Sequence, residues 1–216
     1  MNAPGLYLAE INVKCPCCGI VFSTKQLPAL IDTGYRNSEL RQDFKGAMPQ
    51  LEQYAVHSCP RCGHANWSNS FTEVEGSTAE LAESEEIKHL QFRSAALTAE
   101  REGRDFFTVA LFFLHAAWCA DDSNARSQSA EYRRLTADAF KKSLTDGSCP
   151  INQRPEIQYL IGELLRRAGD FEASREHFKQ VLSQLPGRFA LMSRKLMRLA
   201  EMGNQEAIDF EANVNL

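Results

Sequence analysis

The sequence predicts a mainly α-helical protein with a small β module near its N-terminus, and three observations favour this fold class. Two short cysteine motifs, the second of which ends at Gly63, lie among runs that are typical of short strands. Beyond residue 77, apolar residues recur at helical spacing and strand signals are nearly absent. A Gly-Asp pair at residues 169–170 recurs as Gly-Asn at residues 203–204, and this displacement equals the period of a tetratricopeptide helical repeat.

The two cysteine motifs share one pattern, CPCCG at residues 15–19 and CPRCG at residues 59–63. The CxxC spacing turns both thiolates to one side, at a separation that suits two ligands of a tetrahedral zinc ion. The glycine that follows can adopt the positive φ that turns backbone N–H groups toward sulfur. We therefore predict one structural zinc ion per chain. Its four expected ligands are Cys15, Cys18, Cys59 and Cys62.

Alternatives to this zinc site remain open on the sequence. Cys17 forms a CxC pair with Cys15, but that shorter turn breaks the match with the second motif, so we predict that Cys17 is not a ligand. His57 and His64 flank the second motif and are expected to be ordinary surface residues of the module. Iron also accepts four thiolates. Four thiolates leave no open position for water, which disfavours a zinc hydrolase.

The cysteine motifs divide the chain into two predicted domains. Residues 1–76 form a zinc-ribbon-like module with a long polar insert at 23–53, a loop or partly helical segment that is a candidate functional surface. An acidic run from Glu73 to Glu86 contains a capping-box pattern at Ser77–Glu80, which opens a helix. We therefore place the boundary there, with a helical domain at 77–216.

Six helices are predicted in the second domain. They span Leu81–Arg101, Phe106–Ala120, Ser129–Leu144, Glu156–Ala168, Phe171–Leu185 and Phe189–Met202. Phe106–Ala120 is the most apolar of them, but a membrane-spanning helix needs about 20 apolar residues. We interpret it as a buried core helix, and no secretory signal precedes it.

Residues 155–186 match the tetratricopeptide pattern of two helices with small residues at their contact. Gly162 and Ser174 would let the helices approach, and Phe178 would cover the contact. Residues 189–216 form a degenerate second copy. The fold class is thus a four-cysteine zinc ribbon plus a tetratricopeptide-like α-helical repeat domain.

Helical repeats of this kind generally present a concave surface lined by their first helices. A surface of mixed charge with one aromatic side chain suits an extended peptide or a partner helix, so we expect a protein or peptide partner there. For any single position, an ordinary solvated helix residue is an equally good interpretation. The candidate partner-binding residues are Tyr159, Glu163, Arg166 and Arg167.

The chain also resembles a bacterial family of uncharacterised proteins that is defined as a domain of unknown function. The resemblance rests on CPCCGIVFSTKQL at residues 15–27, the Arg41–Phe44 segment, Pro49, Tyr54 and HSCPRCGHANWSNSF at residues 57–71. It implies a metal-binding N-terminus and tetratricopeptide-like helices, and it brings no activity or substrate. Where the family more often has an aromatic residue after the second motif, this chain has His64.

These features favour a non-enzymatic cytoplasmic adaptor that binds a protein or peptide. The formal net charge is -4, and both predicted domains have more acidic than basic residues, which disfavours a nucleic-acid or membrane partner. Seven cysteines, an odd number with two close pairs, point to metal binding in a reducing compartment. Nucleic-acid binding through the ribbon is the alternative, and a thiol-based redox or zinc sensor that uses Cys17 is the second alternative.

Overall fold

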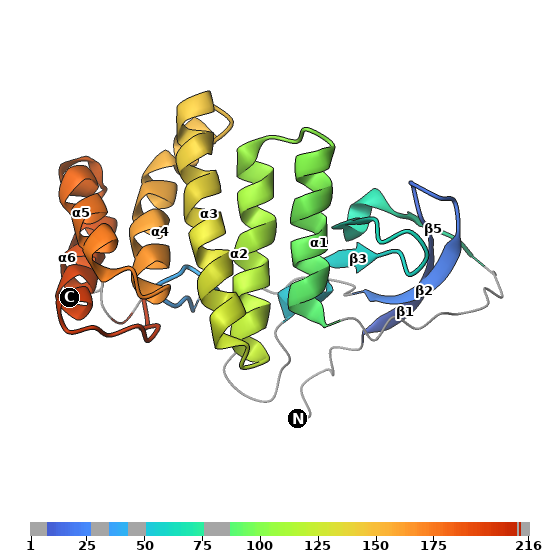
Figure 1. The fold of residues 1–216 in the computed structure, drawn as a ribbon, viewed down its shortest axis with the longest axis horizontal. Helices are drawn as coiled ribbons and strands as arrows, with labels where there is room; N and C mark the ends of the chain where they lie inside the picture. The colour runs from blue at the N-terminus through green and yellow to red at the C-terminus, as the bar shows by residue number, and fades with distance from the viewer. Residues whose placement is uncertain (1–7, 27–34, 43–50, 76–86, 211, 213–216) are drawn as a thin grey trace, which may run out of the picture.

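The computed structural model describes residues 8–26, 35–42, 51–75, 87–210 and 212 (Figure 1). The α-helices in these residues are α1 (Lys88–Arg101), α2 (Phe106–Asp122), α3 (Arg126–Asp146), α4 (Arg154–Arg167), α5 (Phe171–Val181) and α6 (Gly187–Glu201). They match the six predicted helices within a few residues at each described end. The capping box and the first turns predicted at 77–86 lie outside the described residues. In the part of the chain that is described, no helix is long and apolar enough to cross a membrane.

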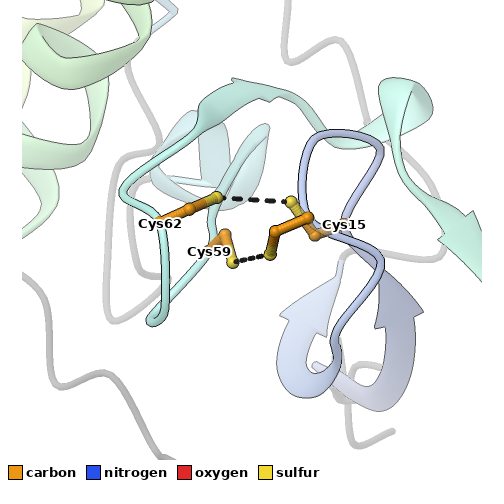
Figure 2. Close-up of side chains that lie close together, drawn as sticks. Cys15, Cys59 and Cys62 are labelled. Carbon is orange, nitrogen blue, oxygen red and sulfur yellow. Dashed lines mark hydrogen bonds between the residues drawn. The ribbon is translucent and has the colours of Figure 1, made fainter.

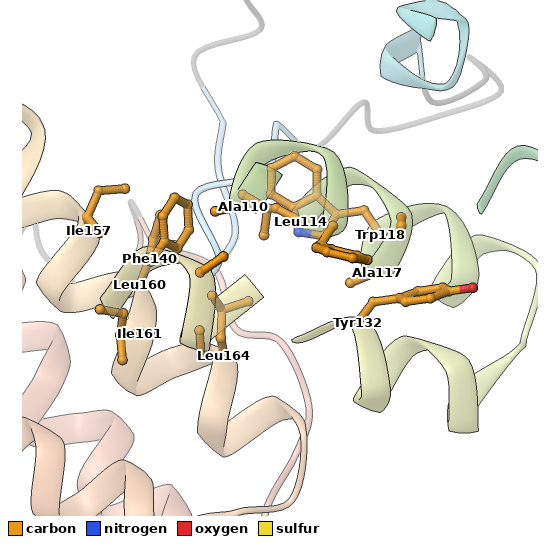
Figure 3. Close-up of a cluster of buried hydrophobic side chains, with 14 of the residues drawn as sticks. Ala110, Leu114, Ala117, Trp118, Tyr132, Phe140, Ile157, Leu160, Ile161 and Leu164 are labelled. Carbon is orange, nitrogen blue, oxygen red and sulfur yellow. The ribbon is translucent and has the colours of Figure 1, made fainter. Parts of the chain in front are cut away.

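The helices stand side by side in chain order from α1 to α4, with α5 and α6 closing the far end (Figure 1). Their shared core is apolar and continuous, and α2, the most apolar of the helices, stands between α1 and α3 (Figure 1). Figure 3 shows side chains of α2, α3 and α4 meeting in this core, including Leu114, Phe140 and Leu160. Burial of these side chains is the main driving force for stacking the helices.

The contact between α4 and α5 is close and is formed by small residues and one aromatic ring. The Ser174 hydroxyl donates a 2.7 Å hydrogen bond to the Gly162 carbonyl oxygen. A Cβ at Gly162 would lie 2.4 Å from two ring carbons of Phe178, so only glycine fits without a shift. The turns after α4 and α6 are alike, since Gly169 and Gly203 both have positive φ. The bond from the amide of Asp170 to the Leu165 carbonyl has its counterpart in the second turn, from Asn204 to Leu199.

The C-terminal segment differs from a second helical repeat. After α6, residues 204–208 are neither helix nor strand, and Asp209 forms an isolated antiparallel bridge with Asn37. Phe210 is buried in the main core, where its ring lies 5.7 Å from that of Tyr159. Residues 211 and 213–216 lie outside the described residues. The segment 204–210 thus runs back over the helices instead of starting another one.

The strands form two small antiparallel sheets. One has the order β2-β1-β5, from β1 (Ala9–Lys14), β2 (Val21–Gln26) and β5 (Thr72–Glu73). The other pairs β3 (Val56–Ser58) with β4 (Ala65–Trp67). Short 3-10 turns lie at Leu51–Tyr54, Ser68–Ser70, Ile151–Gln153 and Leu182–Gln184. Among the described strands, those of the β3–β4 hairpin join the helical core, through Val56 and Ala65, and the Trp67 ring stacks on Phe112 with centroids 4.5 Å apart.

Where it is described, the predicted insert at 23–53 contains strand, 3-10 and bridge segments. Residues 23–26 complete β2, and 51–53 belong to a 3-10 turn. Residues 36–42, here called the insert hairpin, form a tight turn closed by a bridge between Arg36 and Gln42. Its tip, Ser38 and Glu39, is at most 1% exposed. The remaining residues of the insert, 27–34 and 43–50, lie outside the described residues.

Candidate metal centre

Each cysteine motif forms the same tight turn between two strands. In the first, the Gly19 amide donates to the Cys15 carbonyl at 3.0 Å, and the Cys15 amide donates to the Ile20 carbonyl. In the second, the Gly63 amide donates to the Cys59 carbonyl at 3.0 Å. Gly19 and Gly63 have φ of 74° and 69°, a left-handed backbone conformation that residues with a side chain rarely adopt. The geometry of each turn therefore favours glycine at this position.

The two turns face each other and bring four sulfur atoms together. The Sγ atoms of Cys15 and Cys62 are 3.7 Å apart, and those of Cys18 and Cys59 are 3.6 Å apart (Figure 2). All four lie within 4.8 Å of one another, and each cysteine is a free thiol. A tetrahedral zinc ion with Zn–S bonds of about 2.3 Å places its sulfurs about 3.8 Å apart. The sulfur positions therefore fit a metal ion such as zinc.

Burial differs within the cluster. Cys15 and Cys59, the first cysteine of each turn, are each 1% exposed, and the second cysteine of each turn lies nearer to solvent. Burial raises the pKa of Cys59 to about 12. Burial also opposes ionisation of Cys62, but a backbone hydrogen bond from His64 and the neighbouring thiols lower its pKa to about 7. Four adjacent thiolates need a nearby cation, which a bound metal supplies.

The other candidate ligands lie outside the group of four. Cys17 is exposed. His57 is buried, with Nδ1 3.3 Å from the Thr24 hydroxyl oxygen. The rings of His57 and His64 lie 5.6 and 5.8 Å from the ring of Phe71. Both histidines therefore pack against Phe71, beside the sulfur cluster. The expectation that they lie on the module's surface is wrong for His57, which is 1% exposed.

The sulfur cluster joins two hairpins that are far apart in the chain. Cys15 and Cys18 come from the β1–β2 hairpin, and Cys59 and Cys62 come from the β3–β4 hairpin, which packs on α1. The apolar core beside the cysteines is small, with Val13, Phe22 and Phe71 as its other buried members. A small core supplies little stability by itself. A metal ion here would hold the β1–β2 hairpin against the β3–β4 hairpin, which packs on the helices.

The predicted partner-binding residues are not on an open surface. Tyr159, Glu163 and Arg166 are fully buried, and the Arg167 side chain is 12% exposed. The expectation of a solvent-facing groove is therefore wrong. The reason is that the insert hairpin and the segment 204–210 cover this face of α4.

The covered face is a buried polar network. The Glu163 carboxylate accepts two hydrogen bonds from Arg166, at 2.7 Å each. Arg166 also donates to the backbone carbonyls of Asn204 and Glu206. The Tyr159 hydroxyl donates to the Ser38 carbonyl at 2.7 Å. Each of these three side chains thus binds the protein's own backbone or its charged neighbour.

Sequence reasoning missed a second charged cluster beside this network. Glu39 of the insert hairpin pairs with Arg133, whose Nε is 2.6 Å from its carboxylate, and Arg167 lies 3.8 Å away. Asp121 pairs with both arginines. Burial opposes ionisation of Glu39, but the two arginines outweigh it and hold the pKa of this carboxyl below its ordinary value. Nothing in the local sequence around Glu39 or Arg133 indicates this pair, because the two residues are 94 positions apart in the chain.

Comparison with known proteins places the chain in a family. A family model described as "uncharacterized protein conserved in bacteria (DUF2225)" matches residues 8–102 and 90–200. The chain belongs to this family. The match covers both the sulfur cluster and the helical array, so the resemblance drawn from the cysteine motifs is confirmed at the level of the family. No curated protein and no solved structure matches the chain.

Proposed function

We propose that this protein is a non-enzymatic cytoplasmic adaptor, with one structural zinc ion and a tetratricopeptide-like helical surface that binds a protein or peptide. The observation that carries the proposal is the sulfur cluster: four thiols from two hairpins, spaced 3.6 and 3.7 Å in pairs. A complete thiolate set leaves no position for substrate or water on the metal, so the ion stabilises structure.

The repeat assignment is supported by the contact between α4 and α5. Gly162, Ser174 and Phe178 occupy the positions at which the repeat requires small and aromatic residues. The turns at Gly169 and Gly203 have the same hydrogen bonds, and their displacement along the chain equals the tetratricopeptide period. Arrays of such repeats act by binding other proteins, which is why we favour an adaptor over a catalyst.

The metal half of the proposal is tested by elemental analysis of the purified chain. The parent should hold about one zinc per chain, and Cys59→Ser should lose it together with thermal stability. Cys17→Ser is the matched control, because the same substitution in the first turn removes an exposed thiol outside the cluster. Equal metal content in Cys59→Ser and the parent would contradict the site. Iron in place of zinc would change the identity of the ion but not its structural role.

The adaptor half is tested by isolating the tagged chain from bacterial cells after cross-linking. A protein partner in about equal amount to the chain is the expected result. Salt-sensitive retention on DNA or RNA, with no protein partner, would favour the nucleic-acid alternative instead. Loss of a measured cellular response in Cys17→Ser, with zinc still bound, would favour the sensor alternative.

A further inference from the structure

The insert hairpin is held mainly by side chains of helices, and this resembles the way a bound peptide is held. Among the described residues, its backbone pairs through the bridge between Arg36 and Gln42, the bridge between Asn37 and Asp209, and bonds within its own turn or to the segment 204–210. It joins neither sheet. Its side-chain contacts include Glu52, 11 residues beyond Arg41, and residues of α2, α3 and α4 that are 77 to 125 residues away in the chain.

We propose that the face of α2, α3 and α4 beneath the insert hairpin is a receptor for a peptide turn with a carboxylate and a guanidinium two residues apart, and that residues 36–42 occupy it as an internal ligand. The partner is a segment of another protein with this same chemistry, which binds when the hairpin leaves. This inference rests on the proposed adaptor function and names the chemistry of its partner.

The first recognition point is the carboxylate position. The guanidinium of Arg133 donates two hydrogen bonds to Glu39, at 2.6 and 2.7 Å. Arg167 adds a second positive charge, and Asp121 balances only one of these two arginines. Without Glu39, the helices would keep one excess positive charge at this place. A ligand of the receptor therefore has to supply a carboxylate.

The second recognition point is the guanidinium position. Arg41 donates to both carboxylate oxygens of Asp122 on α2, at 2.9 and 2.6 Å. Its guanidinium also lies 5.7 Å from the ring centroid of Trp118, within the range of a cation–π contact. Glu52 binds the same arginine from outside the receptor face. A planar, bidentate contact of this kind selects arginine over lysine.

Between these two points, α4 contacts Ser38 of the turn through its carbonyl and its hydroxyl group. Tyr159 donates to the Ser38 carbonyl, and the Ser38 hydroxyl donates to Glu163 at 2.5 Å. Leu40 lies between Glu39 and Arg41 with φ of 59°, a left-handed conformation that a leucine rarely adopts. Hydrogen bonds within the hairpin support this turn, because the Leu40 amide donates to the Asn37 carbonyl and the Asn37 side-chain oxygen accepts from the amides of Glu39 and Arg41.

The probe for this receptor is a fluorescent synthetic peptide of residues 35–42, and the test uses the full chain. In the variant Glu39→Gln with Arg41→Gln, the internal ligand loses both charged anchors while the receptor side chains stay intact. Anisotropy should show at least tenfold tighter peptide binding to this variant than to the parent. A peptide with glutamine in place of Glu39 and of Arg41 should not bind. Equal, weak binding to variant and parent would overturn the proposal.

The matched control makes the same pair of changes elsewhere, in Glu172→Gln with Arg175→Gln. These residues form an exposed ion pair on α5. This control should bind the peptide as weakly as the parent. Light scattering of the parent should give a monomer, and a dimer formed by exchanging hairpins would overturn the assignment to a different protein.

A second measurement needs no variant, in case the doubly changed chain does not fold. Hydrogen exchange of the parent should show the amides of Ser38 and Leu40 exchanging well before those in the middle of α4, and faster still with excess peptide. If the hairpin amides exchange only with those of α4, the hairpin is a fixed part of the core and the proposal is wrong. This result would not contradict the proposed adaptor function, because the isolation of the cross-linked, tagged chain tests that function separately.

Discussion

Replacing Gly162 by alanine tests the close contact between α4 and α5. The added Cβ would lie 2.4 Å from Cε1 and Cζ of Phe178 and 2.8 Å from Cδ1. The Phe178 ring is fully buried, so it has no open space to move into. Overpacking of a core costs about 1–3 kcal/mol, and two carbons at this distance favour the upper end. Alanine recovers about 1 kcal/mol of helix propensity. We therefore expect a net loss of about 2 kcal/mol.

Urea unfolding at about 25 °C, followed by tryptophan fluorescence at constant metal content, measures this loss. A thermal scan should show a midpoint lower by about 4–8 °C. The double variant with Phe178→Leu should recover part of the loss, because the smaller side chain removes the ring carbons that the methyl group meets. A double-mutant cycle should therefore give a coupling energy of at least about 1 kcal/mol.

Gly187→Ala is the matched control for this prediction. The same methyl group is added at the first residue of α6, where no atom lies within 4 Å of the new carbon. Its stability should stay within about 0.5 kcal/mol of the parent or rise slightly. If Gly162→Ala is as stable as this control, the close approach of α4 and α5 does not exist in solution and the argument from packing is wrong.

Three further predictions follow from the site and the core. A zinc chelator should lower the melting temperature of the parent and of Cys17→Ser but leave that of Cys62→Ser unchanged, as calorimetry would show. Burial lowers the pKa of His115 to about 4, and an unfolded histidine titrates near 6.5, so the unfolded chain binds the proton first as the pH falls. The shift of His115 alone should therefore lower the stability by about 3 kcal/mol between about pH 6.5 and 4, and urea unfolding of His115→Gln should lack this part of the slope. Ser174→Ala removes a buried hydrogen bond and should cost about 1 kcal/mol in the same urea assay, whereas no change would contradict that bond's contribution.

Patterns within short stretches of the sequence determined much of the fold. Each cysteine turn is specified by one CPxCG motif, so its geometry could be predicted from its Cys and Gly positions. All six helices followed from the spacing of apolar residues, because that spacing reports directly which face of a helix is buried. The four-sulfur cluster also followed, since two such turns in one chain have one common use, a shared metal ion.

The environment of the helix faces was decided only by the tertiary structure. Tyr159, Glu163 and Arg166 were expected in solvent because polar residues usually are, and they are buried because the insert hairpin and the segment 204–210 supply their partners. Glu39 and Arg133 are 94 residues apart in the chain, and nothing in either local sequence indicates the other. A charged side chain is stable inside a protein only when its partner is brought to it, and which distant segment brings it depends on how the whole chain packs.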